Sequence, residues 1–287
     1  MLLKEKLGKE FVIATELGGT VGTNIAKSLE AIKKYHRIDA LNVIDCASAR
    51  LRINSFALAH IIQTEFPDLA VVPHLTCRDR SILGLQADLL GGNALGIKYI
   101  LATTGDAPHE GPYKTSKPVF NLSSMELIKL INNLNMGIDY NGEQIKGNTD
   151  FFVSATAAPG TKSLDMEIDR MKRKIEAHAG FFQTQPMYDV QKTKTFLSKA
   201  KDLDAPILLG VMPLKSIKMA QFMNENVAGI EIPDDVMDKI GNGVKGVEIA
   251  KEFVKEIYGT DGLSGIHIMA LGDVNATNEI IDYVRGL

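Results

Sequence analysis

The stretch "YILATTGDAP", residues 99–108, begins as an apolar run and ends in a polar turn. Residues 99–102 are apolar, as in strands of parallel sheets that are buried on both faces. Gly105, Asp106 and Pro108 follow, and these residue types favour turns. The segment therefore predicts a buried strand that delivers a carboxylate into the loop at its carboxyl end, where rigid scaffolds often carry functional residues.

The same pattern, a short apolar strand followed by a helical segment, recurs along the whole chain. We expect strands at residues 11–16, 40–45, 70–75, 99–105, 151–158, 181–186, 206–213 and 265–271. We expect helices at residues 24–35, 55–65, 81–95, 123–136, 163–179, 189–201, 215–226 and 275–286. Eight such units in 287 residues predict a (β/α)8 TIM barrel, which typically needs about 250 residues. A doubly wound open sheet is the alternative.

Two details refine this architecture. Residues 227–260 add the segment "GIEIP" and a further helix before the last strand. We therefore expect one α/β domain over residues 1–287, with an extra helix and strand inserted before the eighth strand. Ser123, with Glu126 three residues later, has the spacing of a capping box and predicts the start of the fourth helix.

Composition and charge exclude several classes of protein. The net charge of −3 argues against a nucleic-acid partner, and no apolar run approaches the roughly 18 residues that cross a bilayer. The N-terminal segment "MLLKEKLGKE" carries too many charges for a secretory signal. Cys46 and Cys77 are too few for a disulfide framework or an iron–sulfur cluster, and they fit a reducing compartment. We therefore expect a cytoplasmic protein without membrane insertion.

Polar side chains occur at the carboxyl ends of six of the eight expected strands. Because the loops at that end of a barrel form one mouth, these side chains should converge there. Unpaired buried polar groups cost about 1–3 kcal/mol each, so a purely structural core would contain fewer of them. The residues are Glu16, Asp45, His74, Asp106, Gln183, Gln185 and His267.

Several of these residues also have a structural interpretation. Asp106 can shape its turn by accepting hydrogen bonds from backbone N–H groups. Glu16 can pair with a Lys or Arg across the mouth, and His267 can be a barrel histidine whose hydrogen bonds are satisfied. His74 and Cys77 together lack the three or four ligands that a zinc site needs. None of the expected strands ends in the lysine that a Schiff-base aldolase would require.

Six segments, in order along the chain, together resemble the methylenetetrahydrofolate reductase family of flavin-dependent (β/α)8 barrels. They are "PHLTCRDR" (73–80), "ALGIKYILATTGDAP" (94–108), "MKRKIEAHAGFFQTQPMYD" (171–189), "LLGVMPL" (208–214), "GIEIPDDVMDKI" (229–240) and "GIHIMAL" (265–271). The segment "SSMELIKLINNLNMG" (123–137) is most similar to a bacterial branch in which the reductase module is also found fused to a homocysteine methyltransferase module. We expect no such second module within these residues.

The resemblance implies roles for the matching positions. Glu16 matches the glutamate that acts as general acid at the end of the first strand. Gln185, in "TQP", matches a glutamine that hydrogen-bonds the pterin, and Asp106 matches the aspartate of a Gly-Asp-x-Pro motif near the flavin and the pterin. On its helix, Lys174 can alternatively be a solvated surface lysine, as can Lys172. The positions implied to contact the flavin are His74, Thr104, Gly105, Asp106, Lys174 and Glu167, which replaces the usual Asp.

Several positions depart from the better-known members of the family. Glu16 is followed by "LGGT" rather than by an aromatic residue and a Pro-Pro pair, so the first loop has a different shape. Thr104 stands where Arg is common, and Thr156 where Tyr is common. Ile217 stands where an aromatic residue often covers the nicotinamide or folate. These departures affect the choice of flavin and of electron donor.

The implied activity is reduction of 5,10-methylenetetrahydrofolate to 5-methyltetrahydrofolate by hydride transfer through the flavin, in one-carbon metabolism and methionine biosynthesis. The resemblance favours FAD over FMN, with NADH or NADPH as electron donor and an iron–sulfur partner subunit as the alternative donor. Tetrahydrofolate derivatives are the expected small-molecule partners, and assembly as a homo-oligomer is also considered. The alternative function is a non-redox pterin-binding methyltransferase, or a folate-binding subunit that depends on another protein for electrons.

Overall fold

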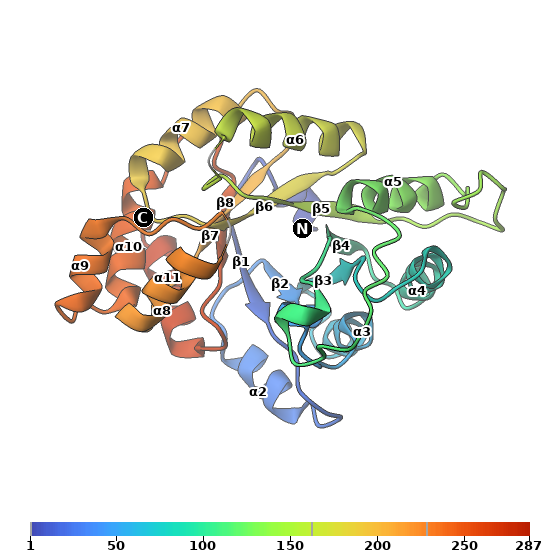
Figure 1. The fold of residues 1–287 in the computed structure, drawn as a ribbon, viewed down its shortest axis with the longest axis horizontal. Helices are drawn as coiled ribbons and strands as arrows, with labels where there is room; N and C mark the ends of the chain where they lie inside the picture. The colour runs from blue at the N-terminus through green and yellow to red at the C-terminus, as the bar shows by residue number, and fades with distance from the viewer. Residues whose placement is uncertain (1, 162, 228) are drawn as a thin grey trace.

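The centre of the protein is a closed barrel of eight parallel strands that follow one another in sequence order (Figure 1). The computed structural model describes residues 2–161, 163–227 and 229–287. The first and last strands pair with each other, so the barrel has no open edge. This confirms the predicted TIM barrel and excludes the doubly wound open sheet. The strands are β1 (Val12–Leu17), β2 (Ala40–Val43), β3 (Ala70–Thr76), β4 (Tyr99–Thr103), β5 (Phe152–Ala157), β6 (Phe181–Pro186), β7 (Ile207–Val211) and β8 (Gly265–Ile268).

Apolar side chains fill the amino-terminal end of the barrel interior. Val12, Leu101 and Phe181 belong to one buried cluster there. The short helix α1 (Leu3–Lys6) adds Leu3 to the same cluster and so closes this end of the barrel. Burial of apolar surface, at about 25 cal/mol per Å², stabilises this end. A site for polar chemistry must therefore lie at the opposite end, where the strands finish.

A ring of helices covers the outside of the barrel (Figure 1). The predicted capping box is confirmed at one of them, because the Ser123 hydroxyl accepts from the Glu126 N–H and the Glu126 carboxylate accepts from the Ser123 N–H. Two short 3-10 helices, η1 (Ala47–Ala49) and η2 (Pro108–Glu110), lie in the loops after β2 and β4. The ring includes α2 (Ala26–Lys34), α3 (Ser55–Glu65), α4 (Ile82–Ala94), α5 (Ser124–Asn135), α6 (Leu164–Glu176), α7 (Val190–Ala200) and α11 (Val274–Arg285).

The connection between β7 and β8 differs from the prediction. It contains the three helices α8 (Ile217–Asn226), α9 (Asp234–Gly241) and α10 (Gly246–Ile257). The last of them, α10, packs against α7 and α11, and therefore occupies the ring position that we predicted for residues 215–226. Residues 229–233, predicted as an inserted strand, have no strand structure. The insertion consists of α8 and α9.

The size of the apolar face explains which helix joins the ring. α10 buries Phe253, Val254 and Ile257 among its apolar residues, and these side chains pack on the main core. α8 buries only Ala220 and Met223 among its described residues. These two side chains belong to a separate small cluster that α8 shares with α9. Because a larger apolar face gains more free energy against the barrel, α10 displaces α8 from the ring.

Candidate active site

A network of neutral polar side chains spans the barrel interior above the apolar end. Asn42 on β2 and Gln183 on β6 exchange two side-chain hydrogen bonds of 2.9 Å across the barrel. Gln183 also donates to the Ser154 hydroxyl at 3.3 Å, and His74 Nε2 lies 3.3 Å from Asn42 Oδ1. Asn42 and Ser154 are not among the site residues that we predicted from the sequence. The signal that could have found them is a polar residue inside a mostly apolar strand, with Asn42 in "ALNVID" and Ser154 in "FFVSATAA".

Glu16 lies near the carboxyl end of β1, and its side chain is only 11% exposed. Burial raises its pKa from the ordinary value of 4.5 to about 7. Among residues 2–161, 163–227 and 229–287, no Lys or Arg forms an ion pair with it, so the alternative of a structural ion pair is wrong there. A carboxyl group with this pKa is partly protonated at neutral pH, as a general acid must be.

His267 and His74 face the same interior and are both neutral at physiological pH. Burial lowers the pKa of His267 to about 3, with His74 adding to the effect, and it lowers the pKa of His74 to about 4 against the opposing charge of Asp45. His267 Nε2 lies 3.8 Å from Glu16 Oε2, so this contact is not an ion pair. Neither ring nitrogen of His267 has a hydrogen-bond partner in the described part of the chain. The interpretation of His267 as a satisfied histidine is therefore wrong.

Asp106 lies in the loop after β4 and links this loop to the one after β2. Its carboxylate accepts a hydrogen bond of 2.5 Å from the Ser48 N–H, while the side chain remains exposed. The backbone of Cys46, Ser48 and Ala49 is left-handed, which is uncommon for residues other than glycine and often occurs at functional sites. Asp106 thus shapes the loops as the structural interpretation predicted, and it does so at the barrel mouth.

Thr104 and Gly105 precede Asp106 at the end of β4. Thr104 is exposed, and Gly105 has a φ of +86°. A Cβ atom on Gly105 would lie 2.8 Å from the Cβ of Thr76, so only glycine fits this position without displacement. The backbone at the end of β4 is therefore free of a side chain at this point.

Glu167 and Lys174 both lie on α6, and both are buried rather than solvated. Lys174 Nζ donates to the Thr156 carbonyl at 2.6 Å, and Glu167 Oε1 accepts from the Ala158 N–H at 2.9 Å. Lys174 is 5% exposed, so the alternative of a surface lysine is wrong. Its pKa is lowered to about 8, mainly by burial, with Glu167 opposing the shift and Arg170 adding to it. The two residues hold the carboxyl end of β5 to α6.

Gln185 lies at the end of β6, two residues after Gln183. The pairing of β6 with β7 is irregular between Gln183 and Pro186, which changes the direction of the strand at this point. The Gln185 side chain is half-buried and forms no hydrogen bond within the ranges that the structure describes. Its amide is therefore available to a ligand at the mouth.

The Asp45 carboxylate is buried and is hydrogen-bonded to other residues of the protein. Its carboxylate accepts from the Thr76 N–H at 3.1 Å, from the Thr76 hydroxyl at 2.8 Å and from Arg80 at 2.6 Å. Arg80 also donates to Asp88 on α4. Asp45 therefore connects the loop after β2 with β3 and α4.

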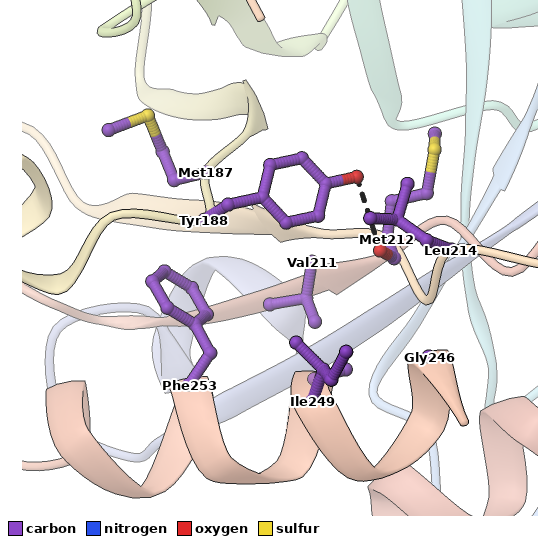
Figure 2. A pocket seen from close by; sticks show the side chains of 9 residues that line it. Met187, Tyr188, Val211, Met212, Leu214, Gly246, Ile249 and Phe253 are labelled. Carbon is purple, nitrogen blue, oxygen red and sulfur yellow. Dashed lines mark hydrogen bonds between the residues drawn. The ribbon is translucent and has the colours of Figure 1, made fainter. Parts of the chain in front are cut away.

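The described residues also form depressions outside this polar network, one of them about 470 Å³ in volume between the loop after β7, the start of α10 and α11. A small apolar cavity lies between the ends of β6 and β7 and α10, where Tyr188 donates to the Met212 carbonyl at 3.2 Å (Figure 2). Its volume of about 10 Å³ is enough for one water molecule at most. Within the described ranges, no group of three His, Cys, Asp or Glu residues could hold a metal ion. No helix in these ranges is long and apolar enough to cross a membrane.

Solved structures show the fold alone. The crystal structure of an oxaloacetate acetylhydrolase aligns over 95% of this chain and 80% of its own, with a TM-score of 0.56 and 11% identity. A 2,3-dimethylmalate lyase aligns over 99% of this chain and 84% of its own, with a TM-score of 0.54 and 11% identity. At this identity, the shared barrel carries no information on the reaction.

Sequence comparisons show the family. Methylenetetrahydrofolate reductase 1 of Schizosaccharomyces pombe is 24% identical over 97% of this chain, and the chain spans only 46% of that protein's length. The 5,10-methylenetetrahydrofolate reductases of Pectobacterium carotovorum and Escherichia coli are 28% and 26% identical over 74% and 71% of this chain, and over 69% and 66% of their own lengths. The family model described as methylenetetrahydrofolate reductase matches residues 10–285. The chain therefore belongs to the methylenetetrahydrofolate reductase family.

Proposed function

We propose that this protein reduces 5,10-methylenetetrahydrofolate to 5-methyltetrahydrofolate with the help of a bound flavin. The observation that carries the proposal is Glu16, a buried carboxyl group at the barrel mouth whose pKa is raised to about 7. Opening of the five-membered ring of the substrate requires protonation of nitrogen 10, and an acid that is still protonated near neutral pH can supply this proton. Membership of the family supports the same reaction.

The residues at the mouth fit a flavin. When bound, the flavin would carry the hydride from the electron donor to the folate. Lys174 uses one of its three N–H donors on the Thr156 carbonyl and has two left for a phosphate or ring oxygen. Gly105, whose missing side chain lets the loop after β4 pack closely on Thr76, keeps this turn in place beside the proposed flavin site. The proposed flavin-binding residues are His74, Thr104, Gly105, Asp106, Glu167 and Lys174, with FAD favoured over FMN.

Two further residues would act on the folate. The Gln185 amide has no partner within the described residues and can both donate to and accept from the edge of the pterin. Asp106 is an exposed carboxylate at the mouth, and its negative charge would stabilise the cationic iminium form of the opened substrate. Glu16 would donate the proton, Gln185 would orient the ring, and Asp106 would stabilise the charge.

The source of electrons and the assembly are also part of the proposal. We propose NADH or NADPH as the donor, with an iron–sulfur partner subunit as the alternative, and a homo-oligomer as the assembly. Cys46 and Cys77 are both free thiols, which fits the proposed cytoplasmic location. The segment 123–137 supports placement in the bacterial branch that includes fusions to homocysteine methyltransferase.

The first experiment is to purify the protein, identify any bound flavin and follow its absorption during anaerobic addition of NADH and then NADPH. We expect the absorption to bleach with one of them and to return when 5,10-methylenetetrahydrofolate is added. Bleaching by 5-methyltetrahydrofolate but by neither nucleotide would show that another protein supplies the electrons. A colourless protein that binds folate and takes up neither FAD nor FMN would favour the non-redox methyltransferase or folate-binding subunit instead.

A further inference from the structure

His267 is a buried side chain whose hydrogen-bonding groups are unused. It lies on β8, where it pairs in register with Ala14 of β1 and Gly210 of β7, and it is 4% exposed. Both ring nitrogens are buried, and neither has a partner in the described part of the chain. Because buried polar groups in folded proteins are almost always bonded, this histidine needs an explanation.

The carboxyl group of Glu16 is the partner that the geometry offers. His267 Nε2 lies 3.8 Å from Glu16 Oε2, and a movement of about 1 Å would bring the two atoms to hydrogen-bond distance. A neutral imidazole has one N–H donor and one nitrogen lone pair, and a protonated carboxyl group has one O–H donor. The two side chains are therefore complementary when both are neutral.

Few other charges act on this pair. Besides burial, His74 on β3 lowers the pKa of His267. Asp45, in the loop after β2, opposes the lowering of the pKa of His74 by burial. Burial raises the pKa of Tyr35, at the end of α2, and the negative charge of Glu16 adds to this shift. Among the residues that the structure describes, no lysine or arginine is paired with Glu16 or His267.

We propose that His267 is a positioning residue, which accepts a hydrogen bond from the protonated Glu16 carboxyl group and so fixes the place of the acidic proton. The lone pair of Nε2 would accept, and the ring proton would be on Nδ1. The use of this proton in catalysis rests on the proposed reductase function. The hydrogen bond itself does not, so it can be tested without any reaction.

The sign of the effect on Glu16 separates this role from simple space filling. A hydrogen bond to the neutral acid stabilises the protonated form and raises the pKa. Replacement of His267 by methionine, which is similar in size and a poor acceptor, should therefore lower the pKa of Glu16. If His267 only fills space, the same replacement makes the surroundings more apolar and should leave the pKa unchanged or raise it.

The test is a pH titration followed by ¹³C NMR, on substrate-free protein whose glutamate carboxyl groups carry the label. The Glu16 signal is identified as the one that is missing in the Glu16→Gln variant. We expect the pKa of Glu16 to be lower in His267→Met than in wild type by about half a pH unit or more, because the hydrogen bond to the neutral acid is lost. His267→Gln, which is matched to methionine in size and has an accepting carbonyl, should restore it. His60→Leu on α3, outside the barrel, should have no effect. An unchanged or higher pKa in His267→Met would overturn the proposal.

A second measurement needs no substitution at His267 and therefore covers the case in which that variant does not fold. The ¹⁵N shift of an imidazole nitrogen lone pair changes when it accepts a hydrogen bond, so the spectrum of His267 should differ between wild type and Glu16→Leu below pH 6. Identical His267 signals would contradict the proposal. If wild-type protein has no reductase activity but both NMR experiments give the expected results, only the proposed function is refuted.

Discussion

Two buried groups of titratable residues in this barrel have opposite properties. At β5 and α6, Glu167 and Lys174 are held by hydrogen bonds to the backbone of Ala158 and Thr156. At β1 and β8, Glu16 and His267 lie 3.8 Å apart and are bonded to no other side chain in the described ranges. The residues of the first group have hydrogen-bond partners within the described part of the protein, and those of the second group do not.

The difference favours Glu16 over the residues of α6 as the proposed proton donor. A buried polar group that is hydrogen-bonded to the backbone stabilises the fold. A buried carboxyl group without partners has a pKa shifted toward neutrality and remains available to a substrate. The comparison supports the proposal that Glu16 transfers the proton, while Glu167 and Lys174 hold the end of β5 in place for the proposed flavin.

The largest expected effect is on catalysis at Glu16. Glu16→Gln removes the proton donor while keeping the shape of the side chain, and we expect the folate half-reaction to slow by about 10²–10⁴-fold. Flavin reduction should be unchanged, because that step needs no acid from the protein. Stopped-flow measurement of the two half-reactions checks this. A folate step at the wild-type rate would remove Glu16 from the mechanism.

The next effect is on stability as a function of pH. The pKa of Glu16 is about 7 in the folded protein and about 4.5 when exposed, so between these values the folded state binds more protons than the unfolded state. The contribution of Glu16 to stability is therefore full below pH 4.5 and is lost as pH rises through 7, by on the order of 3 kcal/mol. Urea unfolding of wild type and Glu16→Gln from pH 4.5 to 8 measures it. Equal pH dependence in both proteins would contradict the assigned pKa.

A smaller effect is expected at the satisfied group. Lys174→Met leaves the Thr156 carbonyl without its donor, and we expect a loss of about 1.5–3 kcal/mol in the free energy of unfolding. Lys172→Met is the matched control on the same helix, because Lys172 is exposed and its ion pair with Asp169 is worth less than about 0.5 kcal/mol. Urea unfolding of the two variants gives the comparison. Equal losses would mean that the buried contact of Lys174 does not stabilise the fold.

Most of the barrel could be predicted from local patterns. Each of the eight expected barrel strands was found, because strands buried on both faces appear as apolar runs that need no knowledge of their neighbours, whereas the expected inserted strand at residues 229–233 was not. The error concerned the helices between β7 and β8. Helical periodicity occurs in both α8 and α10, and it cannot tell which helix packs on the barrel and which lies outside it.

The sequence alone determined the (β/α)8 architecture, the placement of Glu16, His74 and Asp106 at strand ends, and, through its segments, membership of the reductase family. Only the tertiary structure decided which polar groups are satisfied. It joined Asn42 to Gln183 across 141 positions, buried Lys174 against β5 and left His267 beside Glu16 without a partner. The reason is physical, since burial and hydrogen bonding depend on residues that meet only when the barrel closes.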